Sequence, residues 1–338
     1  MVFSSIETLD VVNPRPCRRA SSITADATCM SGTNKELTGC RRPAVALCLV
    51  GVWFSGGCNV DQLIDPEGNL RETTSYRAAY EDTLLEVARR FKLGYVEMVA
   101  ANPGTDPWIP GEGTDVVLPT VHLLPDAAPE GIVINLADMR LYYFGDPAGP
   151  PRSYPIGIGR DGLNTPLGST ELVRKRKDPT WHPTARMRAE DPELPEVVPP
   201  GPDNPLGNRA MYLGWPAYLI HGTNKPWGIG RRSSSGCIRM YPEDAEELFD
   251  LAGIGTKVTV VDQPIKLEWV DGELFMEAHP TQLQSDELEA EGRFTPELPS
   301  RVVDEVIEQA GAQSSRLDWS RVRRVTMERR GYPIRITR

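Results

Sequence analysis

The sequence predicts a mainly β fold, a β-sandwich or barrel, preceded by a small α+β module. From residue 131 onward, short apolar or alternating runs recur between glycines and prolines, as they do in sandwiches and barrels. Residues 80–119 instead hold two helical patterns followed by one strand-like run. A hydrophobic content of 40% in 338 residues supports buried cores in two ordinary domains.

The strand-like runs of the β part follow one another at short intervals. Two of them, 132–136 and 140–144, flank Asp138 and predict a hairpin. The others lie at 153–159, 170–175, 212–222 and 256–262. One helix is expected among them at 242–253, because the segment starts with proline, has acidic residues in its first turn and ends in glycine.

The small module is predicted to contain two helices and a closing strand. Apolar residues recur at helical spacing from 84 to 91, with Asp82 or Thr83 as the N-cap. A second helix over 95–101 ends at Asn-Pro-Gly, and the run VVLPT at 116–120 predicts the strand.

The strongest chemical signal is a histidine and a cysteine in one stretch rich in glycine and serine. His221 begins the stretch HGTNKPWGIGRRSSSGCIRM, and Cys237 follows between Gly236 and Ile238. Every other cysteine precedes residue 60, so Cys237 has no disulfide partner beyond the N-terminal leader. Core packing is the alternative for a lone cysteine, but the small residues at 233–236 bury almost nothing.

These residue types suit nucleophilic catalysis. A nearby imidazole lowers the pKa of a thiol from about 8.5 into the physiological range. A glycine before the nucleophile leaves backbone N–H groups free to hold an oxyanion. The stretch therefore predicts Cys237 as nucleophile, His221 as base and oxyanion donors around Gly236. Because no acidic third member is evident, a backbone carbonyl near Gly222 is expected to orient the imidazole.

Residues 220–240 resemble the signature of the L,D-transpeptidases, the YkuD-type and ErfK/YbiS-like enzymes that act on bacterial peptidoglycan. In that signature HG(T/S) is followed by (S/T)HGC and by an arginine two residues further on. The matching residues are His221, Gly222, Thr223, Gly236, Cys237 and Arg239. Ser235 stands where the family has a second histidine, but the resemblance assigns the base to the first. It also implies a YkuD-like β-sandwich or barrel catalytic domain over 129–263.

The residues around the dyad are expected to bind the substrate. Peptidoglycan stems end in carboxylates, and the guanidinium of Arg239 can hold one bidentately; a surface salt bridge is the alternative. Gly222 and Thr223 are expected beside it. The helix at 242–253 is expected to start next to Cys237, where its dipole favours negative charge. The TP-x-G turn at 165–168 also resembles the family and needs no catalytic role.

Residues 75–122 resemble a LysM carbohydrate-binding module. The segment 82–84, Ala88, Asn102 and the segment 110–119 fall at LysM positions, while Glu81 replaces the usual glycine. The resemblance implies the glycan of peptidoglycan as the ligand. The alternative is a helical hairpin that only spaces the catalytic domain from its anchor.

Two further segments have no counterpart in these patterns. Eight prolines between residues 177 and 208 predict a long loop without regular structure. Because it precedes the strand of His221, it predicts a lid or a wall of the substrate groove, with Trp181 and His182 as contacts. The extension 264–338 carries a predicted hairpin turning at 271–272, a helix around 300–310 and no chemical motif.

Residues 1–58 predict a leader that directs export. An arginine pair at 41–42, an apolar run at 43–54 and small residues after it fit a secretory signal, whereas a membrane span needs about 20 apolar residues. Met30 is an alternative start. The small residues before Cys58 predict lipidation of Cys58 and plain signal cleavage equally well. We therefore expect a periplasmic or cell-envelope protein that meets the membrane only through a signal or lipid anchor.

Together these features predict an exported transpeptidase acting on peptidoglycan stem peptides. The resemblance implies release of D-alanine, followed by a cross-link or attachment of an envelope lipoprotein. The alternatives are an L,D-carboxypeptidase, a cysteine endopeptidase or amidase, and a catalytically weak wall anchor. No cofactor is expected, and the spacing of His122, His182 and His279 does not indicate zinc. A net charge of −10 without a basic block speaks against nucleic-acid binding.

Overall fold

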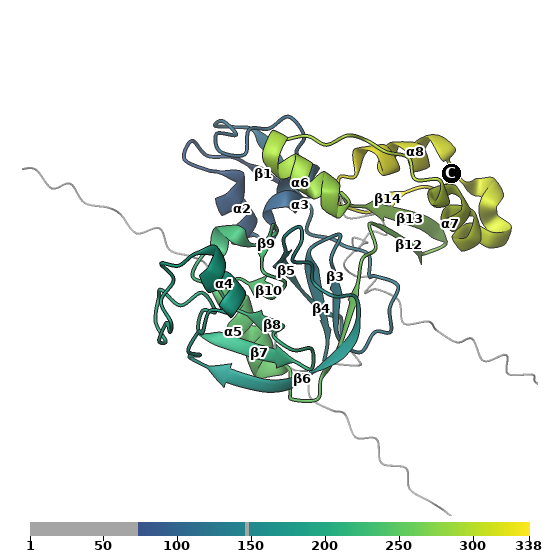
Figure 1. Ribbon diagram of the computed structural model, residues 1–338. Coiled ribbons are helices and arrows are strands. Elements are labelled where there is room, and N and C mark those ends of the chain that lie inside the picture. The colour runs from purple at the N-terminus through teal and green to yellow at the C-terminus, as the bar shows by residue number, and fades with distance from the viewer. Residues whose placement is uncertain (1–73, 146–148) are drawn as a thin grey trace, which may run out of the picture. The chain divides into compact units, whose positions relative to one another are not determined.

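The computed structural model describes residues 74–145 and 149–338 and gives them a mixed α/β architecture (Figure 1). The predicted leader 1–58, with its signal sequence and Cys58, lies outside the described residues. Within the described segments, no helix combines the length and apolar character needed to cross a membrane.

The N-terminal module is a βααβ unit. Its elements are β1 (Thr74–Arg77), α2 (Leu84–Arg90), α3 (Tyr95–Ala101) and β2 (Asp115–Leu118). The two strands pair antiparallel. Thr83 caps α2 by accepting the N–H of Glu86, so the second of the two predicted caps is used. Both predicted helices and the closing strand are confirmed, whereas β1 was missed because it is a short and mostly exposed strand without an apolar run.

The β part is a closed ring of strands rather than a sandwich of two open sheets. In spatial order its strands are β10 (Ile238–Met240), β8 (Leu219–His221), β7 (Arg209–Leu213), β6 (Gly168–Lys177), β11 (Lys257–Val261), β3 (Gly131–Asn135), β4 (Arg140–Phe144) and β5 (Arg152–Gly159). The ring closes because β10 pairs both with β8 and with β5. A further strand, β9 (Arg232–Ser234), pairs parallel with β5.

The described helices and turns of this part agree with the prediction in one place and correct it in two. α5 (Pro242–Leu251) is the predicted helix. The predicted run 212–222 is a hairpin, β7 and β8, because Gly-Trp-Pro interrupts it. The Pro-rich segment is not entirely loop, since α4 (Ala185–Glu190) forms within it. The prolines flank these six residues rather than interrupting them, and Thr184 provides the N-cap.

Buried hydrophobic side chains of the module and of the barrel form one continuous core. Leu84 and Val87 of the module belong to the same cluster as Ile132 and Ile238 of the barrel. The module is also joined to the barrel by a buried ion pair between Glu97 and Arg140, with oxygen and nitrogen 3.1 Å apart. The two parts therefore share one interior.

The C-terminal extension forms a three-stranded sheet with helices packed on it. Its elements are β12 (Ile265–Val270), β13 (Glu273–Ala278), α6 (Gln282–Glu291), α7 (Arg301–Ala310), the 3₁₀ turn η2 (Gly311–Arg316), α8 (Trp319–Glu328) and β14 (Ile334–Arg335). Asp271 and Gly272 both have positive φ, as a two-residue hairpin turn requires, so the predicted hairpin is confirmed. A second apolar cluster fills the space beneath α7 and α8.

Candidate active site

The register of two neighbouring strands brings the predicted nucleophile and base together. β8 and β10 run parallel, with Ile220 opposite Ile238 and His221 opposite Arg239. Side chains alternate along a strand, so Cys237, His221 and Arg239 all face the same side. The two isoleucines face the other side and are fully buried in the core.

His221 is buried and held by the backbone. Its Nδ1 lies 2.6 Å from the carbonyl oxygen of Gly222, so Nδ1–H donates to that carbonyl and Nε2 is left as an acceptor. This is the orienting carbonyl that the sequence predicts. Burial, and secondarily the positive charge of Arg239, lowers the pKa of His221 from 6.5 to about 4, although the Gly222 and Leu206 carbonyls oppose the shift. The imidazole is therefore uncharged at neutral pH.

The thiol of Cys237 is half-buried and forms no disulfide with any residue that the structure describes. Its Sγ lies 3.5 Å from the carbonyl oxygen of Ala217, to which the S–H donates. Burial raises the pKa of the Cys237 thiol, although the Leu219 N–H and the Arg239 charge lower it in part. The expectation that the imidazole lowers this pKa is wrong, because His221 is itself neutral and desolvation dominates. The resting pair is a thiol beside an imidazole, not an ion pair.

The turn before Cys237 is fixed by hydroxyl groups. The Ser234 hydroxyl accepts the N–H of Gly236 at 3.1 Å and donates to the Cys237 carbonyl at 2.6 Å. Thr165 donates to the Gly236 carbonyl at 2.9 Å, so the TP-x-G turn contacts this loop directly. The Gly236 N–H is therefore engaged, contrary to the expectation that it is free for an oxyanion. We find no partner for the Cys237 N–H among residues 74–145 and 149–338.

Gly236 must be glycine for two reasons. Its φ of +104° is strained for any residue with a side chain. A Cβ atom there would lie 2.8 Å from the ring of Tyr218.

Arg239 carries a charge that no described carboxylate balances. Its Nη1 donates to the carbonyl and the hydroxyl of Ser233, each at 3.3 Å, and its buried Nε has no hydrogen-bond partner within 74–145 and 149–338. No carboxylate in the described parts of the chain lies within ion-pair distance of it. Burial, and secondarily the charge of Arg160, lowers the pKa of Arg239. Arg160 itself pairs with Glu190, so the positive charge left to favour binding of an anion is that of Arg239.

The other predicted site residues take simpler positions. Thr223 is buried, and its hydroxyl accepts the N–H of Lys225 at 3.0 Å, which closes the turn after His221. Gly222 supplies the orienting carbonyl. The hydroxyl of Ser235 makes no hydrogen bond to the described residues.

The helix that was expected to start next to Cys237 starts farther away. The strand β10 separates Cys237 from Pro242, the first residue of α5. Five residues of extended chain span roughly 15 Å, so the dipole of α5 acts elsewhere. Its N-terminal Glu243 and Asp244 pair with Arg89 and Lys92 of the N-terminal module.

The Pro-rich segment contacts residues close in sequence to the candidate site. Asn224, three residues after His221, donates to the Asp203 carbonyl at 3.0 Å. Glu190 of α4 pairs with Arg160 at 3.3 Å, and the Arg160 N–H donates to the Ser234 carbonyl. Trp181 is half-buried and bridges to Val198, whereas His182 is exposed.

Sequence reasoning missed the residue that holds this segment together. Asn204 is fully buried, and its side-chain amide donates to the carbonyls of Pro179, Val198 and Pro199. Its Oδ1 accepts the N–H of Leu206. One asparagine among prolines carries no signal of this role in the sequence.

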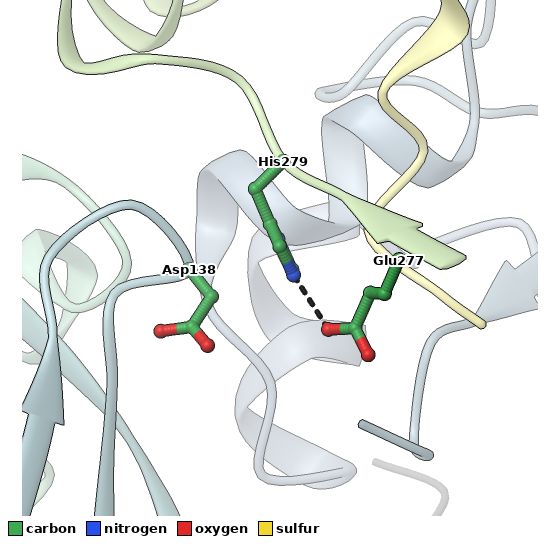
Figure 2. A group of neighbouring side chains, drawn as sticks. All are labelled: Asp138, Glu277 and His279. Atoms are coloured by element: carbon green, nitrogen blue, oxygen red, sulfur yellow. Dashed lines mark hydrogen bonds and ion pairs between the residues drawn. The ribbon is translucent and has the colours of Figure 1, made fainter. Parts of the chain in front are cut away.

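One cluster outside this site has metal-binding residue types. Asp138, Glu277 and His279 lie within 4.8 Å of one another and are buried (Figure 2). The ammonium of Lys266 pairs with Asp138 at 2.9 Å and with Glu277 at 2.7 Å, and His279 bonds Glu277 at 2.6 Å. An ammonium of the chain itself thus pairs with both carboxylates. This cluster is a buried ion network that joins the barrel to the C-terminal extension.

The site and the closed sheet belong to a known class of enzyme. The sequence model of the YkuD family, described as the L,D-transpeptidase catalytic domain, matches residues 129–260. The chain belongs to the L,D-transpeptidases, a family of cysteine-dependent enzymes.

Curated relatives extend this similarity over most of the chain. It is 39% identical over 278 residues to the "Probable L,D-transpeptidase YbiS" of Escherichia coli K12, covering 80% of this chain and 85% of that protein. The "Probable L,D-transpeptidase ErfK/SrfK" of the same strain is 36% identical over 305 residues, covering 86% of this chain and 96% of that protein. A solved L,D-transpeptidase from Mycobacterium smegmatis covers 38% of this chain and 57% of its own, with 22% identity and a TM-score of 0.30.

Proposed function

We propose that the protein is exported through its leader and acts on peptidoglycan stem peptides through a thioester on Cys237. One observation carries the proposal. Cys237 and His221 face the same side of adjacent strands, and the Gly222 carbonyl holds Nδ1 so that Nε2 is free to take a proton. The proposal assigns catalysis to residues 129–263, glycan binding to residues 75–122 and support of the site to residues 264–338.

The proposed reaction starts from the neutral pair. On substrate binding the S–H turns from the Ala217 carbonyl towards Nε2 of His221, because hydrogen bonds in resting sites often tighten only in the complex. The imidazole takes the thiol proton while sulfur attacks the carbonyl at the L-centre of the stem peptide. The imidazolium then gives that proton to the leaving D-alanine amine, and a thioester remains. An acceptor amine attacks the thioester, the C–S bond breaks, and the proton of the amine restores the thiol.

The turn around Gly236 and Arg239 supply the electrostatic support. The Cys237 N–H is the oxyanion donor in this scheme, because the Gly236 N–H is engaged by Ser234. Gly236 forms the turn that orients the Cys237 N–H. Arg239 binds a substrate carboxylate, since no described carboxylate pairs with it and Nε is buried without a partner. Gly222 and Thr223 shape the floor next to the substrate, and Ser235 takes the place of the second family histidine.

Transfer and hydrolysis differ only in the acceptor. An amine of a neighbouring stem gives a cross-link, a lysine of an envelope lipoprotein gives an attached protein, and water gives an L,D-carboxypeptidase. Purified disaccharide-tetrapeptides incubated with the protein are expected to lose D-alanine, and mass spectrometry then separates cross-linked dimers from trimmed tripeptides. A Cys237→Ala variant of equal melting temperature must show no loss; equal D-alanine release from both proteins would exclude Cys237 as nucleophile.

A catalytically weak wall anchor remains the alternative from another class. It predicts that D-alanine release stays near background in the native protein. A Ser235→His variant that gained substantial activity would then identify the serine as the cause.

We assign glycan binding to the N-terminal module because it has exposed aromatic side chains. Tyr80 is 80% exposed and Trp108 is 56% exposed, each in a loop next to the helices. The Leu84 N–H donates to the Pro107 carbonyl, which joins the two loops. Exposed aromatic rings suit the apolar faces of sugars.

Sedimentation with insoluble peptidoglycan tests this assignment. Tyr80→Ser and Trp108→Ser are each expected to reduce binding by a factor of about 5 or more, which corresponds to about 1 kcal/mol. Ile254→Ser is the matched control, because Ile254 is 68% exposed on the catalytic part of the chain. Equal binding by all four proteins would reduce the module to a spacer.

A further inference from the structure

Helix α6 of the C-terminal extension carries two carboxylates to the strand that precedes Cys237. Glu289 accepts from Nη1 of Arg231 at 2.5 Å, and Asp286 pairs with Arg232. Arg232 also donates to the carbonyl of Gln282, the first residue of α6, at 3.1 Å. α6 therefore binds the start of β9 through ion pairs with two consecutive arginines. The helix lies outside the segment that the family model matches.

These pairs are shielded from water on the side of the arginines. The Arg232 side chain is 5% exposed and that of Arg231 is 16% exposed. Exposed ion pairs contribute little because water and salt screen them, whereas a buried guanidinium depends on its partner. Arg232 also donates to Oδ1 of Asn164, in the loop that carries the TP-x-G turn. The geometry of β9 is thus tied to α6 by two largely buried guanidinium groups whose carboxylate partners are 32% and 39% exposed.

The N-terminal module contacts the segment 229–231, which leads into β9. The Arg231 guanidinium lies 3.6 Å from the centre of the Tyr95 ring. The N–H groups of Tyr95 and Val96, at the start of α3, donate to the carbonyls of Ile229 and Gly230 at 3.3 and 3.0 Å. Arg231 is therefore held between α3 and α6.

The strand β9 is in direct contact with the proposed catalytic groups. Ser233 accepts two hydrogen bonds from Arg239 through its carbonyl and its hydroxyl. Ser234 holds the Gly236 N–H and the Cys237 carbonyl. A displacement of β9 would move the proposed carboxylate binder and the nucleophile together.

We infer that α6 is a positioning element of the active site, with Asp286 and Glu289 as positioning residues that hold β9, and through Ser233 and Ser234 hold Arg239 and Cys237. This inference rests on the proposed function of Cys237 and gives the extension a role in it. Misplacement of reacting groups by about 1 Å reduces rates by roughly a hundredfold, so a modest shift of β9 is sufficient.

The test uses the full chain and kcat/KM for D-alanine release from disaccharide-tetrapeptide. Glu289→Gln and the double variant with Asp286→Asn are expected to lower kcat/KM by about tenfold or more. They are also expected to change the rate at which iodoacetamide alkylates Cys237. Glu289→Asp, which keeps the charge, is expected to restore most of the activity. If the double variant does not fold, the comparison of Glu289→Gln with Glu289→Asp decides.

Two matched controls separate positioning from stability. Glu291→Gln makes the same change on the same helix, but Glu291 is exposed and, among the described residues, pairs only with exposed Arg293 at 3.7 Å, so activity should be unchanged. Val306→Ala weakens the core of the extension without touching α6, so it should lower the melting temperature and keep kcat/KM at 25 °C. An activity loss in Val306→Ala equal to that in Glu289→Gln would overturn the inference.

The outcomes also distinguish this inference from the proposed function. Native kcat/KM in the Asp286→Asn, Glu289→Gln double variant, with no turnover in Cys237→Ala, rejects the role of α6 alone. D-alanine release by Cys237→Ala rejects the proposed function and the inference with it.

Discussion

Replacing Arg239 by glutamine is expected to raise the pKa of His221 part of the way from about 4 towards 6.5. Burial is the larger cause of the low pKa and remains in the variant, while the repulsion from the guanidinium is removed. The difference between 6.5 and about 4 disfavours the imidazolium by about 3 kcal/mol in the folded protein, at about 1.4 kcal/mol per pH unit. The imidazole should thus remain neutral at pH 7 in both proteins.

An NMR titration of Cε1-labelled histidine measures this directly. The chain has four histidines, so His221→Gln assigns the resonance. Arg323→Gln, an exposed position on α8, is the control for the same change of charge. Titration of His221 near pH 6.5 in the native protein, or an Arg239→Gln shift no larger than that of the control, would refute the reasoning.

The same pKa shift predicts how stability depends on pH. Because the folded pKa of His221 lies below the unfolded value, the unfolded chain binds more protons between pH 6.5 and about 4. The penalty is absent above pH 6.5 and reaches about 3 kcal/mol below about pH 4. Urea denaturation of His221→Gln should lack this part of the pH dependence.

Three further substitutions have defined outcomes. Glu97→Gln should cost about 3–5 kcal/mol in urea denaturation, because it leaves the Arg140 guanidinium buried without its partner. Gly236→Ala should lower D-alanine release by about tenfold or more, since both φ and the neighbouring ring resist a Cβ there. Asn204→Ala should cost about 1–3 kcal/mol and expose the Pro-rich segment to limited proteolysis, because three carbonyls lose their donor.

Each of these has an outcome that contradicts it. A stability loss below about 1 kcal/mol in Glu97→Gln would mean that water reaches Arg140. Gly253→Ala, where a Cβ meets nothing within 4 Å, should keep full activity, and equal losses at both glycines would remove the steric argument. Unchanged proteolysis in Asn204→Ala would show that the segment is held by other contacts.

The proposed nucleophile and base stand out in the sequence because their signal is local. The stretch from His221 to Arg239 combines a lone thiol, an imidazole and small residues that bury little, and the strands β8 and β10 then bring its two ends together. The orienting Gly222 carbonyl was predictable for the same reason. The protonation state was not, because it depends on burial by segments far away in the chain.

The supports of the site have no local signal. Arg231 and Arg232 look like ordinary surface arginines, and their partners on α6 lie more than fifty residues later. The mainly β prediction also understated the helices, since α6 and α8 are rich in charged and polar residues and lack a broad apolar face. Asn204 and Thr165 acquire their roles only when distant backbone carbonyls approach them.

The raised pKa of Cys237 means that folding makes the thiol less reactive in general. A thiol in the unfolded chain ionises more readily than this one, and the thiolate is the species that reacts with oxidants and attacks disulfides. If the protein is exported to an oxidising compartment, as proposed, folding of the barrel would thus protect Cys237, the only described cysteine, from oxidation and disulfide exchange. In the proposed reaction, the nucleophilicity of this thiol appears when a bound peptide accepts the sulfur as His221 takes the proton, so the substrate itself completes the activation.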